Sequence, residues 1–409
     1  MKKILIISAL LALSACDPLS EGSTSVEGFE ANLMVAAVVP GYGTSDVIFI
    51  GDTEDESDVV IEKQVHTTNP ADIAIAVNGD NFYRLGRYEY DTLTSVKLNS
   101  ETSVVSLGLE YSVLGDDSSA NPAGMVFVSE DRAYISRTDS PMLWLVNPLA
   151  EVEDDFLIDE IDLSTFSAGA DTKPHMADME IVGNKLFVVL TRLDGFNAKD
   201  NSAVVVINTT TNTIIDADSD NTNGTQAIAL LGRNASEITY LNNKLYVVAS
   251  GDYGNSDTVE KYTGGLYSID LANGYAVDEV VPDGVINDGG NNVTVGNLMD
   301  LDIAPNGDIY FVGSDRGYET PGDWTTYYQY DSVYVIEAGD DKIKAIDLGE
   351  GDFNIGDIQS NSSELYVGVH VQTAAPNASA GVKVVGHNTN ALTGFIETTY
   401  NPVQIIVLN

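Results

Sequence analysis

The segments Asn297-Leu-Met-Asp-Leu-Asp-Ile303 and Asp308-Ile-Tyr-Phe-Val312, joined by a turn containing Pro-Asn-Gly, show the pattern that decides the fold. An apolar run follows Asn and carries Asp, a turn follows, and a second apolar run carries Tyr and Phe. Short apolar runs bounded by turn residues are typical of β-strands. The pattern occurs six times along the chain, so the sequence contains an internal repeat.

The six repeats share a start at Asn or Pro, and they begin at Asn69, Asn121, Pro174, Asn234, Asn297 and Asn354. Successive repeats are 52 to 63 residues apart if the following residues are equivalent: Asp72, Gly124, Asp178, Glu237, Asp300 and Asp357. A third strand such as Ala203–Asn208 follows, and often a fourth such as Thr213–Asp216. Four short strands per repeat, without helical periodicity, indicate β-propeller blades. A β-solenoid, the alternative, has shorter repeats of about 20–30 residues.

Strands outside the six repeats raise the number of blades to seven. They are Leu33–Val39 and Asp46–Ile50 near one end of the sequence and Val403–Leu408 at the other. A blade built from both ends would close the ring and leave no free sheet edge. We therefore expect an all-β fold, a seven-bladed β-propeller of four-stranded antiparallel blades, in one domain over residues 30–409.

The repeat pattern resembles that of YVTN/YncE-like, lactonase-like seven-bladed propellers. More narrowly, it is similar to lipid-anchored cell-surface propellers of Gram-negative bacteria. The stretches that carry this likeness are Asp178-Met-Glu-Ile-Val-Gly-Asn-Lys-Leu-Phe-Val-Val-Leu-Thr-Arg-Leu-Asp194 and Leu231-Gly-Arg-Asn234, within about 340 residues of repeat pattern. The resemblance implies the fold. It implies no single activity, because many such proteins have no assigned chemistry and one group captures corrinoids for an outer-membrane transporter.

Residues 1–15 look like a lipoprotein signal peptide, with Lys2 and Lys3 before an apolar stretch. Leu13-Ser14-Ala15-Cys16 looks like a lipobox, so Cys16 is the expected lipidation site, and residues 16–29 an acidic tether. An ordinary secretory signal with a chance cysteine is the alternative. Asp17 resembles an inner-membrane retention signal, whereas the acidic composition and the family resemblance favour the outer membrane, which we expect.

The composition excludes several kinds of function. Cys16 is the sole cysteine, which rules out disulfides, Cys-ligated zinc and thiol catalysis within the mature fold. A formal net charge of −43 repels nucleic acid, so no nucleic-acid partner is expected. A soluble domain this acidic suits a salty exterior, where screening weakens its self-repulsion.

The start of the first strand in each repeat supplies a set of acidic residues. Because the first strands surround the axis, their starts meet at one mouth of the central channel. The predicted metal ligands there are Asp72, Asp178, Glu237, Asp300 and Asp357. Such carboxylates either bind a cation, Ca²⁺ in the first place, or accept backbone N–H groups from neighbouring blades. Both interpretations stay open.

Four of the seven arginines fall where the second strand of a repeat ends, namely Arg87, Arg137, Arg192 and Arg316. They either form ion pairs that lock blades together or an anion-recognising mouth. The loops leaving this position lengthen at 192–202, 250–264 and 313–331. We predict ligand contacts there from Asp194, Asp252, Tyr253, Tyr318 and Trp324, although aromatic residues of this kind can instead cap their own blades.

Two weaker candidates complete the set. Asp216, Asp218 and Asp220 alternate as in the first half of a calcium loop, but the Gly and the later acidic ligand of such loops are absent. A solvated acidic turn is the alternative. His175 and His370 lie near the channel mouth and could bind a metal or act as a base.

The favoured function is a non-enzymatic lipoprotein that binds a small-molecule ligand or an envelope protein on its loop-rich face. A metal-dependent, lactonase-like hydrolase with His175 as base is one alternative, and an envelope scaffold is the other. We expect no catalytic residue, and Ca²⁺ is the one cofactor considered.

Overall fold

The computed structural model describes residues 6–8, 29–39, 43–53, 57–63, 72–99, 104–169, 172–194, 198, 200–217, 224–252, 262–288, 291–320, 323–349, 354–370 and 379–408. In these ranges the chain forms strands and three short 3-10 helices: η1 (Glu153–Asp155), η2 (Ser164–Phe166) and η3 (Trp324–Thr326). None of the helices in this described part is long and apolar enough to cross a membrane.

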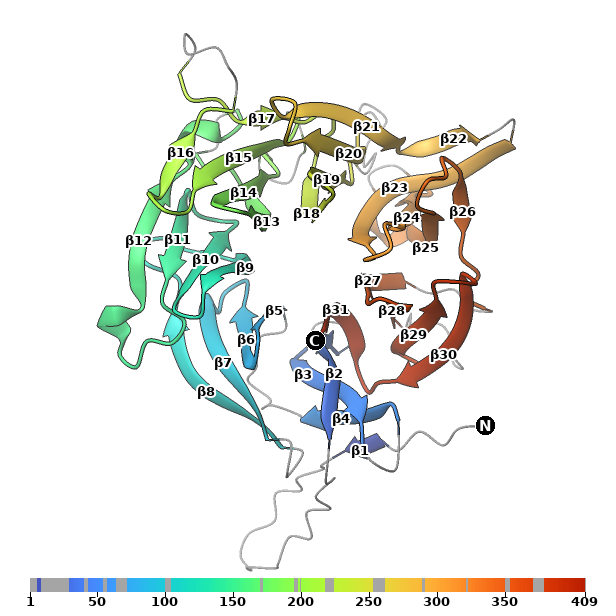
Figure 1. The fold of residues 1–409 in the computed structure, drawn as a ribbon, viewed down its shortest axis with the longest axis horizontal. Helices are drawn as coiled ribbons and strands as arrows, with labels where there is room; N and C mark the ends of the chain where they lie inside the picture. Colours follow the sequence, from blue (N-terminus) through green and yellow to red (C-terminus); the bar gives the residue numbers. More distant parts are fainter. Residues whose placement is uncertain are drawn as a thin grey trace, which may run out of the picture.

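Seven antiparallel blades surround a central axis, which confirms the predicted all-β, seven-bladed propeller (Figure 1). In each of the six blades built from consecutive strands, a first strand lies nearest the axis and later strands lie successively farther out. The first strands contact one another around the axis. This order confirms that strand starts from different repeats meet at one end of the channel.

The first three blades along the chain are formed by β5 (Ile73–Asn78), β6 (Asn81–Gly86), β7 (Thr92–Asn99) and β8 (Val104–Ser112); β9 (Pro122–Ser129), β10 (Arg132–Arg137), β11 (Met142–Val146) and β12 (Leu157–Asp162); and β13 (Met176–Val182), β14 (Lys185–Leu190), β15 (Ala203–Asn208) and β16 (Thr213–Ile215), with β17 (Ile228–Ala229) paired to β15.

The next three blades are formed by β18 (Ala235–Leu241), β19 (Lys244–Ala249), β20 (Gly265–Asp270) and β21 (Ala276–Pro282); β23 (Asn291–Ile303), β24 (Ile309–Tyr318), β25 (Tyr327–Ile336) and β26 (Ile343–Ala345), with β22 (Gly284–Asp288) paired to β23; and β27 (Asn354–Ser360), β28 (Glu364–His370), β29 (Gly381–Gly386) and β30 (Ala391–Glu397).

The seventh blade joins the two ends of the propeller. Its innermost strand is β31 (Asn401–Val407), followed outward by β2 (Glu30–Val38), β3 (Ser45–Asp52) and β4 (Val59–Lys63), with β1 (Ile6–Ser8) parallel to β4. The β31–β2 register runs from Val407 opposite Leu33 to Asn401 opposite Val38. The predicted closure of the ring by N- and C-terminal strands is confirmed.

The hydrophobic core lies between neighbouring blades. Tyr134 and Leu145 of the second blade, for example, pack with Met179 and Val188 of the third. Strands in the middle of a blade are covered on both faces, so they are apolar without alternation, and every residue from Leu186 to Leu190 has 0% exposure. Each buried CH₂ group stabilises the fold by about 0.8 kcal/mol, so these apolar faces are the main source of stability.

Tight turns fix how the strands pair. Leu241 lies opposite Lys244 and leaves a two-residue loop of Asn242 and Asn243, with φ of 50° and 66°. Asparagine tolerates this left-handed conformation, which matches the twist of a hairpin. Asn or Gly occupies this turn in five of the six repeats, and Glu130-Asp131 occupies it in the second. These short turns set the register, and with it the side chains that reach the axis.

Candidate functional site

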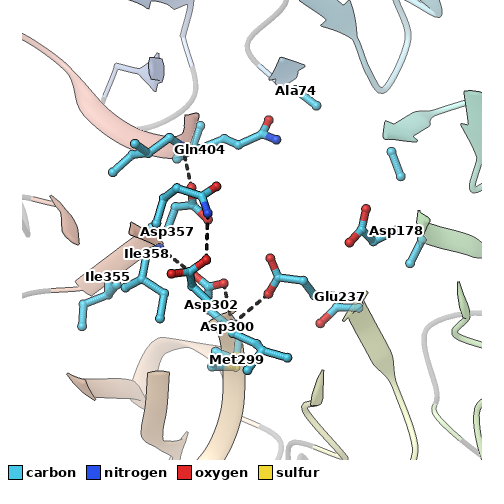
Figure 2. Close-up of a pocket in the computed structure, with 18 of the residues that line it drawn as sticks. Ala74, Asp178, Glu237, Met299, Asp300, Asp302, Ile355, Asp357, Ile358 and Gln404 are labelled. Carbon is cyan, nitrogen blue, oxygen red and sulfur yellow. Dashed lines mark hydrogen bonds between the residues drawn. The ribbon is translucent and has the colours of Figure 1, made fainter. Parts of the chain in front are cut away.

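A cavity of about 890 Å³ lies on the propeller axis, and its lining includes first-strand residues of all seven blades. Figure 2 shows its acidic side, where carboxylates from successive blades point toward one another. We call Asp178, Glu237, Asp300 and Asp357 the acidic ring. They lie at equivalent positions on β13, β18, β23 and β27.

Each member of the acidic ring accepts a backbone N–H from the first strand of the next blade. Asp178 Oδ2 accepts from Ile238 at 3.1 Å, Glu237 Oε2 from Leu301 at 2.9 Å and Asp300 Oδ2 from Ile358 at 2.9 Å. Asp357 Oδ2 accepts in the same way from Ile405. The predicted interblade role of these carboxylates is confirmed, and a role in metal binding is compatible with it because a carboxylate can accept several bonds.

A β-bulge lies at or directly before each ring position and turns the side chain toward the channel. On β23 the register skips Met299, so that Leu298 faces Gly313 and Asp300 faces Val312. On β27 the skipped residue is Gly356. Corresponding shifts occur in β9, β13, β18 and β31 but not in β5. Bulges of this kind re-aim one side chain while the strand continues.

The hydrogen bonds correct the predicted alignment of the first repeat. The backbone N–H of Ile75 donates to Gln404 Oε1 at 2.7 Å, which makes Ala74, and not Asp72, the equivalent of the ring residues. Asp72 instead lines the cavity two residues earlier and pairs with Arg87 at 3.2 Å. The seventh position is held by Gln404, which the sequence did not reveal. One side of the ring is thus acidic, whereas Gln404, Ala74 and Gly124 complete it without charge.

Three members of the ring come close enough to share one cation. Glu237, Asp300 and Asp357 each place a carboxylate oxygen within 4.8 Å of the other two. Burial raises the pKa of Glu237 and of Asp357 well above the usual range, and their negative neighbours, Asp300 first, raise it further. Burial also raises the pKa of Asp178, to about 6. Close, desolvated carboxylates of this kind hold a proton or a cation between them.

A second layer of acidic groups lies one strand step beyond the ring. Burial raises the pKa of Asp302 to about 6, and it raises that of Glu180 to about 7 with the help of the negative charge on Asp178. Asp302 accepts from Gln359 Nε2 at 2.8 Å and from the hydroxyl of Ser360. Period-two alternation, as in Asp178-Met-Glu180 and Asp300-Leu-Asp302, was a signal in the sequence that could have identified this layer.

The four arginines do not form an exposed ring at the mouth. Arg137 is 1% exposed and Arg316 5% exposed, while Arg87 is the one that lines the cavity. Arg137 Nη2 pairs with Asp117 at 2.8 Å, Nε and Nη2 donate to the carbonyls of Val113 and Leu114, and its guanidinium lies 4.2 Å from the centre of the Trp144 ring. The structural interpretation therefore holds for Arg137. Arg192 donates to the carbonyl of Asn201 at 2.9 Å.

The residues that were predicted to contact a ligand lie partly in strands and partly in loops. The segment 313–331 is mostly a hairpin of β24 and β25 rather than a loop, and Tyr318 lies opposite Tyr327 at its end. Trp324 begins η3. Asp252 donates through its backbone N–H to Thr263 Oγ1, and Asp194 is half-buried. Their role in ligand binding remains a prediction.

Several predicted residues lie outside the described residues: Cys16, Asp218, Asp220 and Tyr253. Asp216 is described, and its Oδ1 accepts the backbone N–H of Gln226 at 2.8 Å, closing a turn. His175 is 6% exposed and is not among the residues that line the cavity. His370 does line it, and its Nε2 lies 2.5 Å from the carbonyl oxygen of Pro402.

Comparison with known proteins supports the propeller fold and gives no information on the chemistry of the cavity. The sequence matches no protein-family model, and no curated protein matches it significantly. Solved structures similar to the whole chain include a putative 6-phosphogluconolactonase from Bacteroides fragilis, at 13% identity and a TM-score of 0.55 over 96% of this chain and 100% of the other.

Two further structures are similar over their whole length. A putative 6-phosphogluconolactonase from Bacteroides uniformis is 12% identical, with a TM-score of 0.53 over 92% of this chain and 99% of its own. A functionally unknown protein from Desulfotomaculum acetoxidans is 12% identical, with a TM-score of 0.55 over 93% and 99%. At these identities the likeness is one of propeller fold, and function must be argued from the site.

Proposed function

We propose that this protein is a non-enzymatic, envelope-anchored binding protein that holds a divalent cation, Ca²⁺ in the first place, in its central cavity. The observation that carries the proposal is the approach of Glu237, Asp300 and Asp357 oxygens to within 4.8 Å of one another at the cavity wall. Ca²⁺–oxygen distances of about 2.3–2.6 Å place ligands on opposite sides of one ion about 5 Å apart. Three oxygens spread evenly around one ion at these distances lie about 4.0–4.5 Å apart, so oxygens within 4.8 Å of one another are close to the separation that shared coordination requires.

The donor set favours a hard cation. All three groups are carboxylates, which suits Ca²⁺ or Mg²⁺ better than the softer transition metals. Each of the three carboxylates is also held by a backbone N–H of the next blade, so an ideal octahedron is hard to reach. Ca²⁺ accepts irregular geometry and Mg²⁺ does not, which makes Ca²⁺ the better fit.

Charge balance supports the same conclusion. Among the described residues that line the cavity, Arg87 is the sole Lys or Arg, and it is paired with Asp72. The acidic ring therefore has no protein cation to offset it. A bound divalent ion would offset both the burial and the mutual repulsion that raise the pKa values of Glu237 and Asp357.

The test is calcium binding by isothermal titration calorimetry at pH 7.5, with Mg²⁺ as competitor. We expect Glu237→Gln with Asp357→Asn to weaken Ca²⁺ binding at least tenfold. The matched control is Glu153→Gln with Asp154→Asn, two exposed carboxylates of η1, which changes the net charge equally. Equal affinity of the two double variants, or no binding by the wild-type protein, would overturn the proposal.

The anchor is a separate part of the proposal and rests on the sequence around Cys16. Metabolic labelling with palmitate should mark the wild-type protein and not Cys16→Ala. Labelling that persists in Cys16→Ala would overturn the proposed lipidation site, and it would leave the proposed cation site untested by this experiment.

The geometry gives the hydrolase alternative no specific support. His175, its suggested base, is not among the cavity-lining residues, and His370 has Nε2 occupied by Pro402. A general base must reach the proton that it removes.

A further inference from the structure

The hairpin of β24 and β25 continues beyond the fifth blade and has two different faces. Each of its strands has ten residues, whereas β28 and β29 of the next blade have seven and six. Directly opposed residues share one face of a hairpin, and successive residues alternate between the faces. One face therefore carries Asp315 opposite Tyr330 and Gly317 opposite Tyr328. We call these four residues the aromatic face.

The two rings of the aromatic face lie next to each other and are open to solvent. Tyr330 is 58% exposed, and its ring centroid lies 5.9 Å from that of Tyr328. A Cβ on Gly317 would lie 3.2 Å from the Tyr328 hydroxyl oxygen, so the Tyr328 ring lies across the glycine. Tyrosine offers a large contact area at a small cost in side-chain entropy, which suits these rings to binding.

The charges beside these rings are negative. Asp315 is exposed, and so is Glu319, whose backbone N–H donates to the carbonyl of Thr326 at 3.0 Å. The pairing thus continues one step past the strands, and alternation places Glu319 on the aromatic face as well. Arg316 is the sole Lys or Arg in the sequence from 313 to 331, and it belongs to the other face and is 5% exposed.

A guanidinium group matches this combination of rings and carboxylates. It stacks on aromatic rings, and it pairs with a carboxylate through two parallel N–H groups. Asp315 and Glu319 are four residues apart, which corresponds to about 13 Å along a strand. An extended segment with two arginines four residues apart spans the same distance. The formal net charge of −43 also attracts a basic partner from a distance.

We propose that the aromatic face is a docking site for an extended, arginine-bearing segment of a partner protein. One guanidinium of the segment stacks on Tyr330 and pairs with Asp315. A second, four residues along the segment, stacks on Tyr328 and pairs with Glu319. These four side chains are not among the described residues that line the cavity, so the site goes beyond the proposed cation centre and does not depend on it.

The probe is a short fluorescent peptide with blocked ends and two arginines four residues apart among threonines. Its binding is measured by fluorescence anisotropy at low salt in EDTA. Tyr330→Leu, which keeps apolar area but removes the ring, should weaken binding at least threefold, and Tyr330→Phe should leave it almost unchanged. Asp315→Asn should also weaken it at least threefold. A peptide with citrulline in place of arginine should bind at least tenfold more weakly.

Matched controls lie elsewhere on the surface. Tyr240, at the far end of β18 from the cavity mouth, is 39% exposed, and Glu153 is exposed on η1. Tyr240→Leu and Glu153→Gln should leave affinity unchanged. Equal losses in Tyr330→Leu and Tyr240→Leu, or in Asp315→Asn and Glu153→Gln, would overturn the site, because unspecific attraction to an acidic protein would then explain the binding.

Failure of this site and failure of the cation centre have different signatures. No binding of the arginine peptide by a wild-type protein that still binds Ca²⁺ overturns the docking site alone. Peptide binding in EDTA with the Tyr330 and Asp315 dependence above supports the docking site, even where Ca²⁺ titration shows nothing.

Discussion

At the scale of single residues, the acidic ring combines two demands on the same side chains. Asp300 accepts backbone N–H groups through both carboxylate oxygens, from Leu301 and from Ile358, so it is needed to hold two blades in register. Its neighbours Glu237 and Asp357 must remain close to it in a poorly solvated channel. The hydrogen bonds to the next blade fix the positions of these carboxylates. Their protonation therefore varies with pH and with any bound cation.

This arrangement predicts that the metal-free protein loses stability as pH rises from about 4 to about 7. The pKa of Asp178 is raised to about 6 and that of Glu180 to about 7, so the folded state binds protons that the unfolded state has released. Their contribution is complete below pH 4 and is lost as pH passes the folded-state values. Asp178→Asn with Glu180→Gln should flatten this dependence by on the order of 1 kcal/mol per group, given water in the channel.

The measurement is urea unfolding in EDTA at pH 4.5 and pH 7.5. The amide oxygen that Asp178→Asn introduces can still accept the N–H of Ile238, so the double variant should gain on the wild-type protein at pH 7.5. A wild-type protein that gains stability relative to the variant between pH 4.5 and pH 7.5 would contradict the prediction. Added Ca²⁺ should stabilise the wild-type protein and the double variant alike at pH 7.5, because the proposed ligands Glu237, Asp300 and Asp357 are present in both.

Arg137 allows a prediction of opposite character, because its role is structural. Arg137→Leu removes the buried guanidinium that pairs with Asp117 and donates to the carbonyls of Val113 and Leu114, and it should cost about 3–5 kcal/mol in urea unfolding. Arg87→Leu breaks a half-exposed pair with Asp72 and should cost less than about 1 kcal/mol. Similar losses in the free energy of unfolding for the two variants would contradict the prediction that the buried pair contributes more than the half-exposed pair.

At the scale of strands, the bulge is the element that makes the ring, and it also explains what the sequence could and could not predict. Strands, turns and blade number follow from apolar runs and Asn or Gly residues, since these are local signals. Alignment within a repeat is different. Asp72 offered a carboxylate at the expected place, but β5 has no bulge and Ala74 holds the position.

The arginines show the same limit. Arg87 and Arg137 lie at the ends of β6 and β10, whereas Arg192 lies two residues after β14 and Arg316 lies within β24. Burial of these side chains also depends on what the neighbouring segments cover. Arg137 is covered by the segment around Val113 and Leu114, which comes from the previous repeat. Contacts between repeats are not visible in a pattern within one repeat.

Gly356 tests the importance of the bulge directly. An added Cβ would overlap the carbonyl of Pro402 and the ring of His370, so Gly356→Ala should destabilise the protein by about 1–3 kcal/mol. Gly43→Ala is the control, because that Cβ would meet no atom within 4 Å. Chemical denaturation of both variants gives the comparison, and a neutral Gly356→Ala would mean that β27 can shift without loss.

At the scale of the whole molecule, stability depends on closure. Removing residues 401–409 deletes β31, which exposes one edge of β2 and the apolar residues Met34 to Ala37, all with 0% exposure in the closed ring. We expect the truncated protein to unfold without a single cooperative transition and to associate, as an uncovered strand edge does.

A circular permutant provides the control for this truncation. Leu408 N donates to the carbonyl of Asn32 at 2.8 Å, so in a protein shortened to begin at residue 29 a short linker can join residue 408 to residue 29, and new ends can be opened between β4 and β5. Its thermal transition in calorimetry should match that of the wild-type protein. A truncated protein with an equally sharp transition would show that closure contributes little.

Closure by β31 also sets a schedule for biosynthesis. A ribosome produces β2, β3 and β4 first and β31 last, so the blade that contains them is completed after every other blade has been made. Until β31 has been made, the apolar strand β2 lacks its innermost partner. We therefore expect the edge of β2 to stay unpaired until translation ends, and pairing of the seven-residue β31 to complete the ring last.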